Sequence, residues 1–376
     1  MIDTQVSMND QYKPTKRKFL KWRSPVRGKR NPQVMDNPFW QWCVRNPESA
    51  YQVNQNFNGP DSMSSGPCWC FARMGQTETK LADGRTVYIA GEHEDFYDPD
   101  FYIYSDVVIV DDTKVQIFGY PETEFPPTDF HTATLVGTKI VLVGNLGYQD
   151  KRVPGTTQVL QLDTKTWQMS AVETTGEMPG WIHKHSASFN SDENTIVVSG
   201  GLRFGDRILE NFDDYKLSLE DFTWTQLTDR KWSRWILERE DGETNRLWEI
   251  RNSSMMDQMG VSMEETMEKT FAESGLPPEI ISEMSVSASN DEKAQIKTLY
   301  QSPFSDAIAL EDDEEFGRYR LDVNGTTVRF DETHYHVTVT VEGNLPDDVE
   351  SALITNLQNR LSSIEGSPYI VTRVQE

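Results

Sequence analysis

The fold of the middle of the chain is decided by the stretch His131-Thr-Ala-Thr-Leu-Val-Gly-Thr-Lys-Ile-Val-Leu-Val-Gly-Asn-Leu-Gly147. It contains two short apolar runs around the turn at Gly137 and Thr138. A second copy begins 54 residues later and reads His185-Ser-Ala-Ser-Phe-Asn-Ser-Asp-Glu-Asn-Thr-Ile-Val-Val-Ser-Gly-Gly201. The repeat therefore predicts a β architecture built from similar units, but it does not by itself indicate an activity.

Similar runs recur on both sides of the repeat, between Gly, Asp, Asn and Pro clusters that favour β-turns. The predicted strands are Thr86–Ala90, Asp106–Val110, Val115–Tyr120, Thr132–Val136, Ile140–Val143, Val159–Leu162, Thr195–Ser199, Tyr215–Leu217 and Phe222–Leu227. Gly91, Gly144 and Gly200 each end such a run, at spacings of 53 and 56 residues. A period of about 50 residues with four short strands is typical of a propeller blade.

The order of features within this period resembles the kelch family, in which a His-Ser/Thr-Ala start is followed by a strand ending in Gly-Gly, then a Tyr and a Trp. The matching residues are His185, Gly200, Gly201, Tyr215 and Trp224 in the third unit, His131, Gly144 and Trp167 in the second, and Ala90 and Gly91 in the first. The resemblance covers residues 68–228. It implies a mainly β, kelch-like propeller array of about three blades, with each tryptophan packed between neighbouring blades.

The number of blades leaves the closure of the array open, because closed propellers use roughly four to eight. The favoured interpretation is an open array capped by the flanking segments. A cryptic further blade and a ring completed by a second chain are the alternatives. In kelch repeats the starting histidine most often bonds backbone within its blade, so the resemblance implies that role for His131 and His185. His183 would share a strand face with His185.

The flanking sequence predicts four further segments: a flexible basic arm at 1–34, a helical cap at 35–67, a helical and linker region at 229–312, and a small α+β domain at 313–376. Asn37 before Pro38 favours a helix start. Arg230–Ile250 is expected to be helical or capping. In the last segment Asn324-Gly325 favours a hairpin turn. A helix with an apolar stripe at Val349, Leu353, Leu357 and Leu361 is expected to follow it.

The charge of the chain narrows the choice of partner. The 376 residues include 60 acidic and 36 basic ones, which gives a net charge of −24. Residues 1–31 hold nine Lys or Arg and two Asp, so that arm is +7 and the remainder is −31. This balance disfavours nucleic acid and anionic membranes, and it favours a basic protein partner.

The predicted environment is the cytoplasm, because no apolar run approaches the roughly 18 residues of a membrane span and the N-terminus is polar and basic. The three cysteines, Cys43, Cys68 and Cys70, are expected to be reduced and at least partly buried.

The densest polar and aromatic cluster is Glu92–Phe101, directly after the first strand-end glycine. The loops Glu92–Tyr104, Tyr120–Phe130, Asn145–Val153 and Leu202–Asn211 are expected to form one acidic, aromatic-rich recognition face. The predicted partner-binding residues are Glu92, His93, Asp95, Tyr97, Asp98, Asp100, Phe101, Tyr148 and Arg203. His93 with the neighbouring acids can alternatively ligate a divalent cation, although the spacing matches no known metal motif.

These features predict a non-enzymatic protein-interaction module without catalytic residues, cofactor or metal, in an immunity-like or adaptor-like role. No Walker loop and no Gly-x-Ser-x-Gly elbow occurs in the sequence. Two alternatives stay open. One is a metal-dependent enzyme or metal-binding module that uses the His93 loop, and the other is an assembly subunit that oligomerises through residues 313–376.

Overall fold

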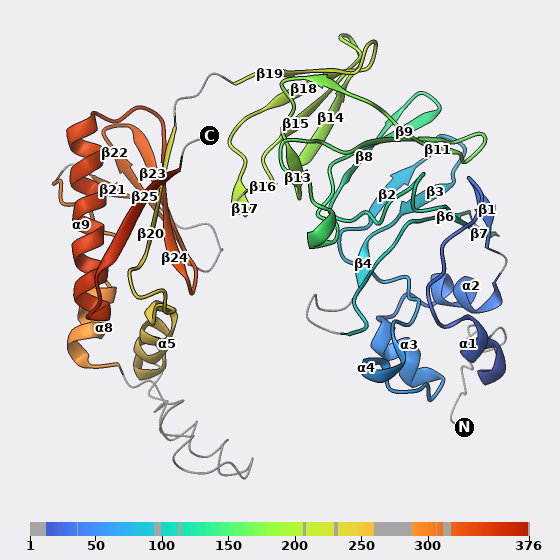
Figure 1. Ribbon diagram of the computed structural model, residues 1–376, viewed down its shortest axis with the longest axis horizontal. Coiled ribbons are helices and arrows are strands. Elements are labelled where there is room, and N and C mark those ends of the chain that lie inside the picture. The colour runs from blue at the N-terminus through green and yellow to red at the C-terminus, as the bar shows by residue number, and fades with distance from the viewer. Residues whose placement is uncertain are drawn as a thin grey trace, which may run out of the picture. The chain divides into compact units, whose positions relative to one another are not determined.

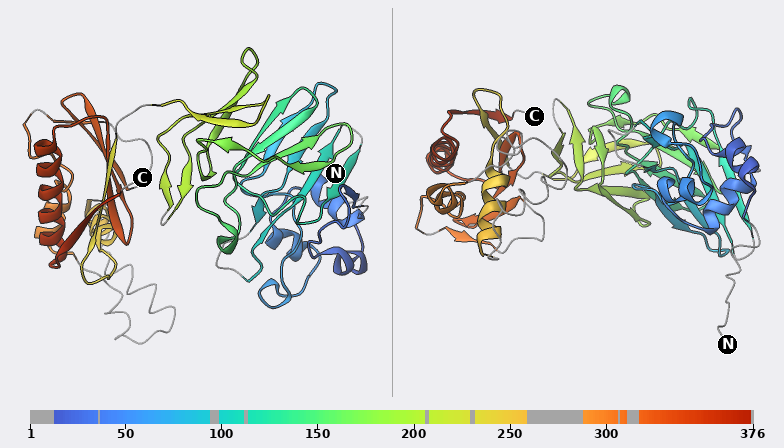
Figure 2. Two further views of the ribbon diagram at one scale, coloured as in Figure 1. Left: turned by 45° about the horizontal axis from the view of Figure 1, so that its top comes forward. Right: turned by 90° about the horizontal axis from the view of Figure 1, so that it is seen from below.

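The computed structural model describes residues 13–35, 37–93, 99–111, 114–205, 208–228, 232–258, 288–305, 307–310 and 317–374. The chain divides into two compact units, Met1–Asp229 and Arg230–Glu376, which are described separately (Figures 1 and 2). The described residues are mainly β, with 25 strands in six sheets. No closed barrel or propeller is found among them.

The first unit begins with a helical segment and continues almost entirely in strands. Its helices are α1 (Lys16–Trp22), α2 (Pro38–Arg45), α3 (Ala50–Asn56), α4 (Ser62–Ser65) and the 3-10 turn η2 (Gln149–Lys151). Its strands are β1 (Gln33–Val34), β2 (Thr77–Lys80), β3 (Thr86–Ile89), β4 (Glu92–His93), β5 (Tyr102–Ile103), β6 (Asp106–Val110), β7 (Val115–Gly119), β8 (Thr132–Val136), β9 (Lys139–Val143), β10 (Val159–Asp163), β11 (Met169–Ala171), β12 (Thr175–Gly176), β13 (Trp181–His183), β14 (Ser186–Asn190), β15 (Thr195–Ser199), β16 (Leu202–Phe204), β17 (Ile208–Glu210), β18 (Tyr215–Ser218) and β19 (Thr223–Gln226).

Three sheets of this unit each contain a four-stranded antiparallel meander. Their orders are β1-β7-β6-β3-β2, β11-β10-β9-β8 and β12-β19-β18-β15-β14, and we call them the first, second and third sheets. Every one of the nine predicted strands corresponds to a strand of these sheets. The smaller sheets β13-β16-β17 and β4-β5 are formed by the connections between strands.

The second sheet is buried on both faces, as its strand β9 makes clear. Ile140 and Leu142 point into the core shared with the first sheet, whereas Val141 and Val143 point into the core shared with the third. This follows from the two-residue period of a strand. Trp167 packs in the first of these cores and Trp224 in the second, so each tryptophan lies between neighbouring sheets as expected.

Histidines join each sheet to the one before it. His131 Nε2 lies 2.9 Å from Thr77 Oγ1, and His185 Nε2 lies 3.0 Å from Thr132 Oγ1. Thr77 and Thr132 begin the first strands, β2 and β8, of the preceding sheets. The predicted backbone partner within the same blade is therefore wrong: each imidazole bonds a threonine hydroxyl across the sheet interface. Burial lowers the pKa of His131 to about 3, which keeps its ring neutral.

The predicted flexible arm is wrong for residues 13–34, which are part of the first unit; residues 1–12 lie outside the described residues. Phe19 of α1 is fully buried, and its ring stacks on Phe57 with centroids 4.8 Å apart. Residues of β1 pair with β7. The few apolar residues of this basic segment are thus enough to anchor it to the first unit. The predicted start of α2 is confirmed, because Asn37 Oδ1 accepts from the amide of Phe39 at 2.9 Å.

The second unit is a six-stranded sheet of order β21-β22-β23-β24-β20-β25 with helices packed against one face (Figure 1). Its elements are β20 (Ser233–Arg239), α5 (Leu247–Gln258), α8 (Asn290–Ile296), β21 (Ile308–Ala309), β22 (Arg318–Val323), β23 (Thr326–Glu332), β24 (His336–Glu342), α9 (Asp347–Glu365) and β25 (Tyr369–Val374). The predicted hairpin is confirmed, since Val323 pairs with Thr326 around Asn324-Gly325. The predicted stripe is confirmed at Leu353, Leu357 and Leu361, which are buried on α9.

Two predictions about this unit are wrong. Arg230–Ile250 is predicted to be helical or capping, but its residues Ser233–Arg239 form β20, which lies between β24 and β25, and only its last four belong to α5. The division between 229–312 and 313–376 is likewise not observed, because α5, α8 and β20 share one core with α9 and the other strands. Trp235, Ile236 and Leu237 form a short apolar run in the middle of β20, and this run is the signal that was missed.

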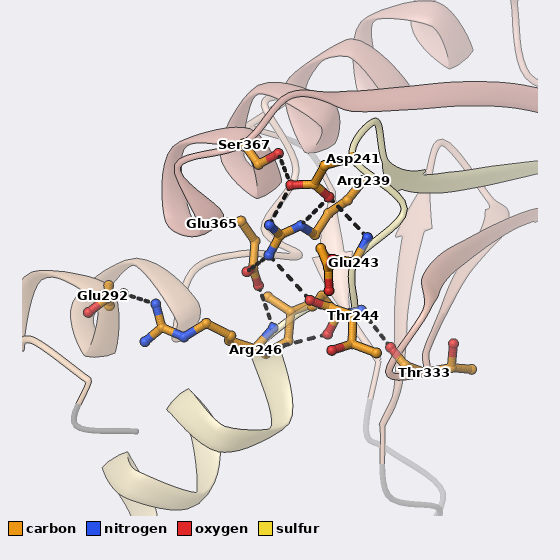
Figure 3. Close-up of polar contacts among 11 residues, drawn as sticks. Arg239, Asp241, Glu243, Thr244, Arg246, Glu292, Thr333, Glu365 and Ser367 are labelled. Carbon is orange, nitrogen blue, oxygen red and sulfur yellow. Dashed lines mark hydrogen bonds and ion pairs between the residues drawn. The ribbon is translucent and has the colours of Figure 1, made fainter. Parts of the chain in front are cut away.

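A polar network joins the end of β20 to the helices (Figure 3). Arg239 contacts Asp241 at 2.6 Å and Glu365 at 3.3 Å. The other oxygen of Glu365 accepts from the amide of Arg246 at 2.8 Å, and the side chain of Arg246 reaches Glu292 of α8 at 3.2 Å. Burial raises the pKa of Glu365. Because these contacts connect β20, α5, α8 and the end of α9, we interpret the network as structural.

Two further observations concern the environment of the chain. No helix among the described residues is long and apolar enough to cross a membrane. Cys43, Cys68 and Cys70 are all buried and free, as expected, although none of the three lies in a strand.

Candidate functional site

The four predicted loops meet at one end of the stacked sheets, which we call the loop end. It consists of the described parts of 92–104, 120–130, 145–153 and 202–211. The amide of Leu146 donates to the carbonyl of Asp129 at 3.1 Å, and the guanidinium of Arg152 lies 5.4 Å from the ring centre of Phe204. In Figure 1, the ribbon that contains β4 extends below the first sheet, and the hairpin of β16 and β17 extends below the third.

Aromatic side chains join the first of these loops to the third. The rings of Phe101 and Tyr148 meet edge to face, with centroids 5.7 Å apart. The hydroxyl of Tyr148 accepts from the amide of Ile103 at 3.0 Å, and burial raises the pKa of that hydroxyl. Phe101, Tyr148 and Phe204 are partly exposed. The loop end therefore carries rings that are both accessible and held in place.

A buried pair of carboxyl groups lies beneath this surface. Asp129 is fully buried; its Oδ1 accepts from the amide of Gly147 at 2.6 Å, and its own amide donates to Asn145 Oδ1 at 3.0 Å. Burial, together with a hydrogen bond and charge repulsion from Asp129, raises the pKa of Glu92 to about 8. Burial also raises the pKa of Asp129. The pair therefore retains a proton near neutral pH.

Basic residues surround the carboxyl pair. Arg152 donates to the carbonyl of Leu146 at 3.0 Å and to that of Gly147 at 3.1 Å. Its charge and that of Lys184 partly oppose the rise in the pKa of Glu92. His183 is buried nearby, and neither of its ring nitrogens has a hydrogen-bond partner within the described part of the chain. Burial lowers the pKa of His183 to about 4, so its ring is neutral at neutral pH.

The structure separates the predicted site residues into two groups. Glu92, His93 and Asp100 are buried, so they form the interior of the loop end and not its surface. His93 Nδ1 lies 2.5 Å from the hydroxyl of Tyr104, and burial lowers the pKa of His93 to about 3. Phe101, Tyr148 and Arg203 are partly exposed. Asp95, Tyr97 and Asp98 lie outside the described residues.

The alternative metal site depends largely on those undescribed acids. Across the described ranges, no group of three or more His, Cys, Asp or Glu side chains is arranged to hold a metal ion. The structure therefore does not bring the described candidates, Glu92, His93 and Asp100, into such a group. The metal-binding hypothesis stays a prediction that rests on Asp95 and Asp98.

Sequence reasoning missed Asp129, Asn145 and Arg152. One signal was present: Glu92 and Asn145 each follow a strand-end glycine, Gly91 and Gly144, and so occupy equivalent positions in the repeat. Both side chains interact with Asp129, which precedes the starting histidine of the second sheet by two residues. Comparing equivalent positions of the repeat would have indicated that Glu92 and Asn145 meet the same residue, Asp129.

Comparisons with known proteins add little to this description. No family model matches the chain, and no curated protein matches it. Among solved structures, one described as the structure of YjhT aligns with 41% of this chain and 50% of its own, at 11% sequence identity and a TM-score of 0.27. A likeness at that level carries no argument about fold or function.

Proposed function

We propose that the protein is a non-enzymatic interaction module that binds another protein through its loop end. The first, second and third sheets would be three blades of an open, kelch-like array. Support for this comes from the four-stranded meanders, the histidine bonds between successive sheets, and the tryptophans in both interfaces. The helices α1, α2 and α3 would cap the array, because they pack on the face of the first sheet opposite to the second.

The observation that carries the proposal is that partly exposed aromatic rings stand on loops tied to one another. Phe101 packs on Tyr148, Tyr148 holds the backbone of Ile103, and Phe204 faces Arg152. A surface ordered before binding loses little conformational freedom on association. Aromatic residues are also enriched in the centres of protein interfaces.

The proposed partner is a basic protein. The net charge of −24 gives the chain a long-range attraction for cations. Glu92 and Asp100 are buried and would contribute to the order of the loops and not to direct contact. The net charge of the whole chain would thus attract the partner, and the aromatic rings of the loop end would make the direct contact. An immunity-like or adaptor-like role fits such a binding protein.

Replacing two rings at the loop end tests this proposal. We expect the double variant Phe101→Ala and Phe204→Ala to bind its partner at least about tenfold more weakly, since each alanine removes part of an aromatic anchor. The partner would be captured from native lysate with the intact protein, and its affinity measured by titration with the purified proteins. Thermal unfolding of the variant would verify its fold.

The matched control is Phe189→Ala. Phe189 is 37% exposed and lies near the end of β14 that is far from the loop end. It should leave the affinity unchanged. Failure to capture any protein, or an equal loss of affinity in the control, would contradict the proposed function.

A further inference from the structure

The strand β25 is an edge strand of the second unit's sheet, and within the described residues only its first residue, Tyr369, is bonded on the outer side by α9. In the described sheet it pairs with β20 on one side, and no strand follows it on the other. Its six residues, Tyr369-Ile-Val-Thr-Arg-Val374, include no proline and no acidic residue, although the whole chain has 60 acids. The opposite edge, β21, has only two residues. An edge strand of this kind is a ready template for another strand.

The hydrogen bonds at the start of β25 show which backbone groups point outward. The amide of Tyr369 donates to Ser362 Oγ at 3.2 Å, and its carbonyl accepts from Gln358 at 2.6 Å, so neither is directed at β20. The neighbouring carbonyl of Pro368 instead accepts from Glu240 at 2.9 Å. Because bonded and non-bonded pairs alternate in an antiparallel ladder, the amides and carbonyls of Val371 and Arg373 also point away from β20.

We infer that two copies of the chain associate through β25, in an antiparallel pair about a two-fold axis at Thr372. Only residues whose backbone amide and carbonyl point away from β20 can exchange hydrogen bonds with the partner strand. Val371 would therefore pair with Arg373 of the partner subunit, and Thr372 with its own symmetry mate. The two six-stranded sheets would become one continuous sheet. This interface concerns the second unit, so it is independent of the proposed binding at the loop end.

The chemistry of the strand favours a second copy as its occupant. The only charged side chain, Arg373, would lie beside Val371 of the partner subunit, so no like charges face each other across the pair. Ile370 is 44% exposed and would lie beside Val374 of the partner subunit. In a chain with a net charge of −24, a segment free of acids is where self-association meets least repulsion.

The first test is the oligomeric state of the full chain and of one edge variant, by light scattering over a range of concentrations. The wild type should approach twice the mass of one chain. Val371→Pro removes only an outward-pointing amide, so it should keep the β20 ladder and weaken dimerisation at least about tenfold, because two bonds are lost by symmetry. Val371→Thr keeps the amide and should dimerise normally. A monomeric wild type, or a Val371→Pro dimer of unchanged affinity, would overturn the inference.

A second test measures which residues of the two β25 strands lie opposite each other, and it does not depend on whether Val371→Pro folds. At the two-fold axis, Thr372→Cys would place two cysteines in a non-bonded pair, whose Cα atoms are about 4.5 Å apart, within the range for a disulfide. Mild oxidation should link most of this variant into covalent dimers. Ile370→Cys, equally on the exposed edge, would face Val374 of the partner subunit and should link much less. Equal linking of the two variants would overturn the proposed pairing.

Discussion

Replacing Asp106 with alanine is expected to destabilise the first unit by about 3–5 kcal/mol, because it leaves a buried guanidinium without its counter-ion. The side chain of Arg73 is fully buried and bonds Asp106 with both terminal nitrogens, at 2.6 and 3.0 Å. Asp106 also accepts from the indole of Trp69 at 3.1 Å. Urea unfolding followed by tryptophan fluorescence measures the change, and seven of the ten tryptophans lie in the first unit.

Two further variants test whether the destabilisation comes from the unpaired buried charge of Arg73 or simply from the loss of an ion pair. Asp83→Ala removes a carboxylate that contacts Arg85 at 2.6 Å on the surface, so it should change stability little. The double variant Arg73→Met and Asp106→Leu should recover part of the loss, since no charge is then left buried. Recovery should be incomplete, because Arg73 also donates to the carbonyls of Cys70 and Ala90. A loss no larger in Asp106→Ala than in Asp83→Ala would contradict this account.

The strands were predictable where apolar residues alternate or run together. Asp106–Val110, Thr132–Val136 and Thr195–Ser199 begin and end as predicted. By contrast, β2 and β14 escaped prediction because most of their residues are Thr, Glu, Lys, Ser or Asn. Each is the first strand of its sheet and lies at the sheet's edge, where few apolar residues are required. Strand β20 was missed for a different reason, since its apolar run is only three residues long and lies between charged residues.

The interior of the loop end was harder to predict than its surface. The acidic cluster was visible in the sequence, but which of its members are buried depends on tertiary contacts. Glu92 and Asp129 meet only because a strand-end loop of the first sheet lies against the segment that leads into the second. The pairing of Arg73 with Asp106 could not be predicted either, since the two residues are 33 positions apart and meet only through tertiary packing. The repeat predicts which elements are adjacent, whereas the polar pairs depend on side-chain packing that the period does not encode.

The buried His93, His131, His183 and His185, whose pKa values are lowered on folding, make stability rise with pH up to about 6.5. Above that pH the stability of the first unit is expected to fall as pH rises to about 8, because the pKa of Glu92 is raised from 4.5 to about 8 on folding. Between these values the unfolded chain has released the proton that the folded chain retains, so deprotonation favours unfolding. The stabilisation is complete below pH 4.5 and lost as pH rises through 8. The raised pKa of Asp129 acts in the same direction. Between pH 6.5 and 8 the loss from Glu92 is on the order of 2 kcal/mol.

Glu92→Gln should flatten this dependence and make the protein more stable than the wild type at pH 8. The amide resembles the protonated carboxyl in shape and can donate to Asp129, whose Oδ2 has no other hydrogen-bond partner in the described structure. Urea unfolding at a series of pH values from 6.5 to 9 measures the effect. Glu122→Gln alters a half-exposed carboxylate that pairs with Arg27 at 3.0 Å, so it should keep the wild-type slope. A wild-type profile that is flat over this window, or a Glu92→Gln profile with the same slope, would show that Glu92 and Asp129 share no proton in the folded protein.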